Sequence, residues 1–124
     1  MLNKHQKFGK KSESVAAAQL EKNGYKILEH NYRTKLGEID IIAKEGDTIV
    51  FVEVKARRSD GFGNPKSAIT PKKQQKISMT ALYYLKATKQ SNAKARFDVV
   101  TIRSGKENPD IEIIKNAFEL AYHG

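Results

Sequence analysis

The chain has 124 residues, of which 39% are hydrophobic and 30% are charged, and this composition is typical of one soluble globular domain. It contains no cysteine, which excludes disulfides and thiolate metal sites, and no apolar run approaches the roughly 20 residues of a membrane-spanning helix. A formal net charge of +9 predicts binding to a polyanion, with nucleic acid as the natural partner and a merely solubilising surface as the alternative.

The first predicted element is a helix that Ser12 caps and that ends at Asn23-Gly24, a pair typical of helix C-termini. Its apolar side carries four residues, Val15, Ala16, Ala17 and Leu20. Residues 1–11 before it are basic and polar, without the apolar stretch of a secretory signal. We therefore expect a flexible N-terminal segment and a cytoplasmic protein.

Apolar and β-branched runs predict five strands, at residues 25–33, 36–44, 48–56, 95–103 and 111–118. The second and third strands form a hairpin that turns at residues 45–47, and the segment SDGFGNPKS that follows them, residues 59–67, is predicted to be a loop. Thr70-Pro71 then predicts the start of a second helix. This helix should extend to about Gln90 and bury Ile77, Ala81, Leu82 and Leu85. The mixed order predicts an α/β domain with a central mixed, mainly antiparallel sheet and helices on both faces.

Charged residues interrupt the apolar hairpin. Alternation along each strand places four of them on one face, Glu38, Asp40, Glu53 and Lys55. The same rule places Ile39 on the opposite face, with Ile41 and Ala43. The two simplest hairpin registers set either Glu38 or Asp40 opposite Glu53, where like charges about 5 Å apart repel each other. Such a cluster would weaken the sheet unless a cation lies among the carboxylates.

A divalent cation with oxygen ligands resolves this repulsion. Asp40, Glu53 and the backbone carbonyl of Val54 offer donors that suit Mg²⁺ or Mn²⁺, completed by waters and substrate phosphates. Lys55 lies on the same face, where its ammonium would orient an attacking water or stabilise a phosphorane-like transition state. This combination favours hydrolysis of a phosphodiester. The alternative is an exposed ion pair on an edge strand.

Asp40 followed by Glu53-x-Lys55 resembles the motif of the PD-(D/E)xK nuclease superfamily, which includes restriction-endonuclease-like enzymes and archaeal Holliday-junction resolvases. More narrowly, the segments GEIDIIA, FVEVKARR, FGNP and RFDVV look like the YraN family of small bacterial proteins, over nearly the whole chain. The resemblance implies one nuclease-like domain, residues 1–124, with a restriction-endonuclease-like core.

The resemblance also implies roles for single residues. Asp40 and Glu53 match the two metal-binding carboxylates, and Lys55 matches the catalytic lysine. Glu13 stands where resolvase-like members carry a glutamate on the first helix that approaches the site. Gln74 resembles a polar residue that some members turn toward the metal.

The chain departs from the superfamily pattern just before Asp40, where Ile39 replaces the nominal proline. Glu38 adds a carboxylate to the same stretch. It is either a further ligand or a charge at the strand end, and we favour the second interpretation.

The remaining basic residues are assigned to phosphates of a nucleic acid, which we expect to be DNA. Arg57 and Arg58 directly follow the site and would bind phosphates beyond the scissile bond, although solvated charges at a strand end are an equal alternative. Further candidates are Lys10, Lys11, Arg33, Lys72 and Lys73. Phosphate contacts carry no base information, so we expect selectivity for a structure such as a junction or flap.

Two hypotheses follow from the sequence. The first is a metal-dependent endonuclease, and the second is a non-catalytic nucleic-acid-binding accessory factor in DNA repair or processing. A protein that only binds nucleic acid gains nothing from carboxylates that face phosphate, so these carboxylates favour the endonuclease. Cuts on two opposing strands would require a homodimer, and the oligomeric state stays open.

Overall fold

The structure is a computed structural model that describes residues 4–58, 69–104 and 110–119. Along these residues the elements are α1 (Lys4–Lys22), β1 (Lys26–Arg33), β2 (Glu38–Glu45), β3 (Thr48–Arg58), α2 (Pro71–Ala87), β4 (Lys94–Ser104) and β5 (Asp110–Phe118). The strands form one sheet in the order β1-β2-β3-β4-β5, in which β3 and β4 are parallel and the other neighbours antiparallel. The predicted α/β fold with a mixed, mainly antiparallel sheet is confirmed, and it is consistent with a restriction-endonuclease-like core.

α1 is longer than predicted. It begins at Lys4, so the predicted cap at Ser12 is wrong. Ser12 lies in the middle of the helix, and its side chain is buried. Residues 4–11, expected to be flexible, form its first two turns. They are rich in lysine, a good helix former, but lack the apolar spacing on which the prediction relied. The end of the helix is as predicted, because Gly24 follows it with a φ of 91°.

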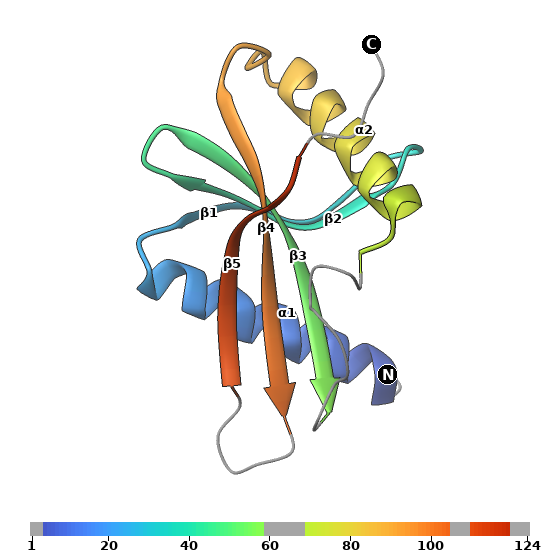
Figure 1. The fold of residues 1–124 in the computed structure, drawn as a ribbon, viewed down its shortest axis with the longest axis vertical. Coiled ribbons are helices and arrows are strands. Elements are labelled where there is room, and N and C mark those ends of the chain that lie inside the picture. Colours follow the sequence, from blue (N-terminus) through green and yellow to red (C-terminus); the bar gives the residue numbers. More distant parts are fainter. Residues whose placement is uncertain (1–3, 59–68, 105–109, 120–124) are drawn as a thin grey trace.

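α1 and α2 cover opposite faces of a strongly twisted sheet (Figure 1). The core under α2 is made of Ile39, Ile42, Ile49, Phe51, Ile69, Ile77, Ala81, Tyr84, Leu85, Phe97 and Val99. The core under α1 is made of Ala16, Ala17, Leu20, Tyr25, Ile41, Ala43, Val50, Val52, Val100 and Ile102. Burial of each large aliphatic or aromatic side chain contributes roughly 1.5–3 kcal/mol, so these two layers hold the fold together. No helix in the described part of the chain is long and apolar enough to cross a membrane.

The alternation predicted for β2 fails at one position. Ile39 packs with Ile42 in the core under α2 and not with Ile41 under α1. On the neighbouring strand, Asn31 lies between residues paired with Ile39 and Ile41, and its φ is 50°. This left-handed residue distorts β1 opposite Asp40, where the regular alternation of β2 is interrupted.

The hairpin register brings the two acids together. Glu45 pairs with Thr48 across a turn at residues 46–47, and Ile41 pairs with Val52. Continued by one residue, this register sets Asp40 opposite Glu53, which is one of the two predicted arrangements.

A buried polar cluster binds the turn end of this hairpin to β4 and β5. Asp98 is fully buried and accepts hydrogen bonds from the Tyr25 hydroxyl (2.8 Å), Arg96 Nε (2.9 Å) and the backbone amide of Asn116 (3.0 Å). Arg96 Nη2 also lies 2.6 Å from Glu45 Oε1, and Lys115 Nζ lies 2.9 Å from Glu45 Oε2. Charge-assisted bonds from two further strands therefore hold Glu45 in place.

α2 begins as predicted. Thr70 is its N-cap, with Oγ1 accepting from the Lys73 amide at 3.2 Å, and Pro71 follows it. The helix ends at Ala87, three residues before the predicted end: Thr88 is its C-cap, and Lys89 after it is left-handed with a φ of 58°. Of the predicted buried face, Leu82 is only half-buried, and Tyr84 is buried in addition to the others.

Gly37 sets how closely α2 approaches the start of β2. A Cβ atom at this position would lie 2.9 Å from Thr80 Oγ1 and 3.4 Å from the Lys76 carbonyl oxygen. Thr80 is fully buried and cannot move aside easily. The missing side chain therefore lets the helix lie against the end of the hairpin that carries Asp40.

Candidate functional site

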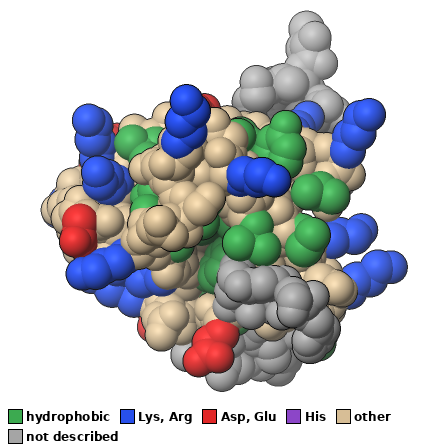
Figure 2. Space-filling view, turned by 90° about the horizontal axis from the view of Figure 1, so that it is seen from above, with side chains coloured by type: hydrophobic (Ala, Val, Ile, Leu, Met, Phe, Trp, Pro, Cys, Tyr) green, Lys and Arg blue, Asp and Glu red, His purple; other side chains and the backbone are tan. Residues whose placement is uncertain are grey.

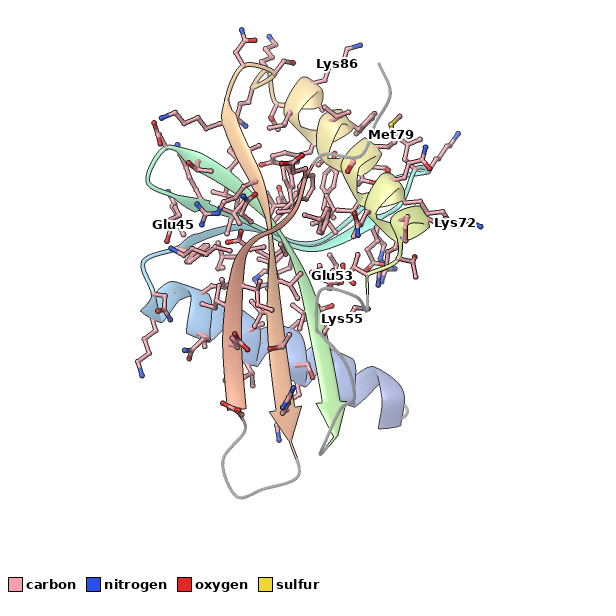
Figure 3. The ribbon with its side chains drawn as sticks, in the orientation of Figure 1. Glu45, Glu53, Lys55, Lys72, Met79 and Lys86 are labelled. Atoms are coloured by element: carbon pink, nitrogen blue, oxygen red, sulfur yellow. The ribbon has the colours of Figure 1, made fainter. Side chains whose placement is uncertain are left out.

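The candidate site lies where β2 and β3 pass the first turn of α2. Glu53 and Lys55 point from β3 toward the start of that helix (Figure 3). The Val54 amide between them donates a 2.8 Å hydrogen bond to Asp40 Oδ2. The strand that carries the second acid and the lysine thus also fixes the first acid.

The surroundings of Asp40 disfavour the charged form of its carboxyl group. Burial raises the pKa of Asp40 to about 7, the charge of Glu53 adds to this, and the Val54 hydrogen bond opposes it. The charges of Glu13 and Glu38 raise the pKa of Asp40 further. Glu53 and Glu13 therefore lie close enough to Asp40 for their charges to act on it, and these are the acids that the hairpin pattern and the family resemblance pointed to.

Glu53 is the more buried of the two acids, with 7% of its surface exposed. Lys73 Nζ lies 2.6 Å from Glu53 Oε1, and Lys55 Nζ lies 3.6 Å from the same oxygen. We predicted Lys73 as a phosphate-binding residue, whereas the structure places its ammonium on a site carboxylate. No strand or helix periodicity relates the first turn of α2 to β3, so the sequence held no signal for this contact.

The two lysines differ in how firmly they hold their proton. Burial lowers the pKa of Lys55, and the adjacent ammonium of Lys73 lowers it further against the attraction of Glu53 and Asp40. Burial is also the largest single influence on the pKa of Lys73 and lowers it, but the hydrogen bond to Glu53, the contact with Lys55 and the charges of Glu53 and Asp40 together outweigh it and leave the pKa raised. Lys55 is thus the readier proton donor of the two.

Other predicted residues lie around the site. Glu13 is half-buried on α1. The Gln74 side-chain amide donates a 2.9 Å hydrogen bond to the Ile69 carbonyl, which braces the segment before α2. Glu38 is exposed and lies 3.4 Å from Arg33 across the β1–β2 pair, the contact expected of a charge at a strand end.

The predicted nucleic-acid contacts are only partly described. Lys11 and Lys72 are exposed, whereas the side chains of Lys10, Arg57 and Arg58 and the whole segment 59–67 lie outside the described residues. Lys72 and Lys76 line a shallow pocket of about 310 Å³ with Leu36, Gln75 and Met79. Figure 2 shows Lys and Arg side chains around the edge of one face, with few acidic ones.

Mg²⁺ or Mn²⁺ fits the residues present. No group of three His, Cys, Asp or Glu side chains in residues 4–58, 69–104 and 110–119 is arranged to hold a metal ion. A metal here would instead be held by Asp40 and Glu53 with waters and phosphates, and Mg²⁺ commonly takes one or two carboxylates in this way. The raised pKa of Asp40 shows that its surroundings disfavour the carboxylate charge, which a divalent cation would compensate.

Residues 12–102 match the model of "Uncharacterised protein family UPF0102". The chain belongs to the UPF0102 family. The UPF0102 protein of Syntrophus aciditrophicus (strain SB) is 57% identical over 114 residues, which cover 92% of this chain and 90% of that protein. The UPF0102 protein of Desulfosudis oleivorans (strain DSM 6200 / JCM 39069 / Hxd3) is 52% identical over 119 residues, which cover 96% of this chain and 95% of that protein. UPF0102, also called YraN, is a member of the PD-(D/E)xK nuclease-like superfamily, as the motif predicted.

The structure of Pyrococcus furiosus SfsA in complex with Ca²⁺ is a distant neighbour, with 14% identity and a TM-score of 0.32. The match covers 87% of this chain and 59% of that one. A similarity this low carries no argument about the UPF0102 site.

Proposed function

We propose that this UPF0102 protein is a divalent-metal-dependent nuclease that hydrolyses phosphodiester bonds in DNA, with structured DNA such as junctions or flaps as its substrate. The observation that supports the proposal best is the convergence of Asp40, Glu53 and Lys55 at one mostly buried corner of the sheet. A carboxylate with a raised pKa, that of Asp40, beside a lysine with a lowered pKa, Lys55, is typical of a reactive site.

Asp40 and Glu53 would hold Mg²⁺ or Mn²⁺, which supplies a Lewis acid for the phosphate and activates water. Lys55 has a pKa lowered by burial, so it exchanges a proton more readily than an ordinary lysine. In its charged form it stabilises the negative charge that develops on the phosphate. The Val54 amide keeps Asp40 oriented during this chemistry.

The charge of the protein supports a polyanionic substrate. With a net charge of +9 and exposed lysines beside the site, the chain attracts phosphates without reading bases. We propose DNA for this reason together with the superfamily, and a homodimer for any cut on two opposing strands.

The test combines metal binding with cleavage. Mn²⁺ and Mg²⁺ are titrated calorimetrically into the wild type and the Asp40→Asn, Glu53→Gln and Lys55→Ala variants, with Glu38→Gln as a matched carboxylate control. We expect Asp40→Asn and Glu53→Gln to lose about 10–100-fold in metal affinity, and Glu38→Gln, whose carboxylate pairs with Arg33, to lose much less. Metal-dependent cleavage of a labelled four-way junction should be lost in all three site variants. Wild-type cleavage that survives in Asp40→Asn would contradict the proposal.

The accessory factor remains the second candidate, because two lysines of the chain already neutralise Glu53 as in a structural ion-pair network. It predicts that the wild type shifts junction DNA in a salt-sensitive gel assay but neither binds Mn²⁺ nor cuts.

A further inference from the structure

Lys73 approaches the site from a different element than the charged residues of the hairpin. Asp40, Glu53 and Lys55 belong to the β2–β3 hairpin, whereas Lys73 reaches Glu53 from the first turn of α2. Its Nζ lies 2.6 Å from Glu53 Oε1, closer than Lys55 Nζ at 3.6 Å. The position a cation would take on this oxygen is thus partly filled by a group of the protein.

The charges of the site explain why this contact matters. Asp40, Glu53, Lys55 and Lys73 have no formal net charge together, and Glu13, whose charge also acts on Asp40, adds one negative charge. A divalent ion added to this cluster would leave an excess of one positive charge. Such an excess is unfavourable in a partly buried site, because charges there are screened less than in water. Release of one ammonium to solvent would therefore restore the charge balance when a metal binds.

Lys73 is better placed to move than Lys55. The backbone of Lys55 is fixed in β3, which pairs with β4 on one side, and 25% of its side chain is exposed. The side chain of Lys73 is 40% exposed and reaches inward from the surface of α2. Rotation of its flexible stem returns the ammonium to solvent with no change of the backbone.

We propose that Lys73 is an internal counter-ion of Glu53 that a divalent metal displaces. The inference rests on the proposed function, because it requires the metal to bind Asp40 and Glu53. In the metal-free protein Lys73 neutralises Glu53 and competes with the metal. In the metal-bound protein the released ammonium lies beside Lys72 at the start of α2, where a phosphate of the substrate can accept it.

This exchange links metal binding to DNA binding. A phosphate that binds the released Lys73 stabilises the metal-bound arrangement, so DNA should tighten metal binding and metal should tighten DNA binding by the same factor. Removal of the Lys73 ammonium should raise the metal affinity and reduce this mutual effect.

The test is calorimetric titration of Mn²⁺ into the full chain, with and without a short DNA duplex. The variants are Lys73→Gln, Lys73→Arg and, as a control that removes the same charge from the last turn of the same helix, Lys86→Gln. We expect Lys73→Gln to bind Mn²⁺ about tenfold more tightly than Lys86→Gln in the absence of DNA. Lys73→Arg retains the charge and should bind as the wild type does. DNA should tighten Mn²⁺ binding less in Lys73→Gln than in the wild type.

The outcomes separate this inference from the proposed function. Equal or weaker Mn²⁺ binding by Lys73→Gln than by Lys86→Gln overturns the counter-ion role and leaves the metal site standing. Wild-type Mn²⁺ binding that Asp40→Asn retains, or no binding by any of the proteins, overturns the metal site and the inference together. Thermal unfolding of each variant establishes that it is folded, and Lys73→Arg tests the charge independently of Lys73→Gln.

Discussion

The amide of Val54 donates its hydrogen bond to the carboxylate of Asp40, at 2.8 Å, where the backbone pairing of β2 and β3 has ended. The Asp40 side chain thus accepts a hydrogen bond from β3 beyond the last backbone pair of β2 and β3. The carboxylate is held in a fixed direction although burial and Glu53 disfavour its charge. The protein itself therefore sets the orientation of the Asp40 carboxylate, and such preorganisation would favour the affinity of any cation bound there.

The stability of the metal-free protein should depend on the protonation of Asp40. Its pKa is raised from the ordinary 3.8 to about 7 in the folded state, so between these values the native protein holds a proton that the unfolded chain has lost. The stabilisation is complete below the lower value and is lost as the pH rises through the upper one. Asp40→Asn retains an acceptor for Val54 without the charge, and at about pH 8 in EDTA we expect it to exceed the wild type by roughly 2 kcal/mol.

Urea unfolding of both proteins across this pH range measures the effect. The difference in free energy of unfolding should be small near the acidic end and should grow toward neutral pH. A difference that does not change with pH would show that Asp40 keeps its ordinary pKa in the folded protein.

Glu13 should influence the same titration from α1. Its charge raises the pKa of Asp40, so Glu13→Gln should move the titration of Asp40 to lower pH. Carboxyl ¹³C shifts followed by NMR report this pKa directly. Glu21→Gln, which removes an exposed carboxylate near the C-terminal end of the same helix, should leave the titration in place.

Replacement of Asp98 should be among the most destabilising changes. Asp98→Ala leaves the Tyr25 hydroxyl, Arg96 Nε and the Asn116 amide without their acceptor, and removal of one partner from such a buried charged network costs about 3–5 kcal/mol. Asp47→Asn removes an exposed carboxylate that lies 3.5 Å from Lys94, and should change stability by no more than about 0.5 kcal/mol. Equal urea midpoints for the two variants would refute a structural role of the network.

Gly37 should tolerate a side chain only when Thr80 is shortened. Gly37→Ala places a methyl group 2.9 Å from Thr80 Oγ1, and such overpacking costs roughly 1–3 kcal/mol. In a Thr80→Ala background the clash is removed and the cost should fall. A double-mutant cycle of unfolding free energies measures this coupling, and additive effects would show that the two residues do not limit the approach of α2.

DNA binding should depend on where charge is changed along α2. Lys72 lies in the first turn and Lys86 in the last (Figure 3). If DNA lies over the start of the helix, Lys72→Glu should weaken binding for all sequences and reduce the salt slope by about one phosphate contact. Lys86→Glu makes the same charge change and should have the smaller effect. Fluorescence anisotropy at several salt concentrations distinguishes them, and equal losses would indicate a non-local attraction.

The sequence predicted the parts of the site that follow local rules. Alternation along two strands and the short turn between them were enough to bring Asp40 and Glu53 together, because both rules act within a hairpin. The same reasoning failed at Ile39, where a left-handed Asn31 on the neighbouring strand disturbs β2. That conformation has no signature within the hairpin itself.

Contacts between distant elements were beyond such rules. Lys73 meets Glu53 because α2 crosses from β3 to β4 and packs on one face, and its rotation is set by buried residues such as Ile77 and Tyr84. The bond from Tyr25 to Asp98 joins positions 73 residues apart in the sequence. Helix packing and buried polar networks depend on the assembled core, which no single segment encodes.

The cluster around Glu45 has a consequence for the far end of the hairpin. A slip of one residue between β2 and β3 would turn every side chain of β2 to the other face and separate Asp40 from Glu53. Arg96 and Lys115 bind Glu45 from two other strands, and these ion pairs favour the alignment that assembles the acids. Transplanted into another scaffold, residues 38–55 would keep their turn and alternation but lose these ion pairs, which support the alignment without touching either acid.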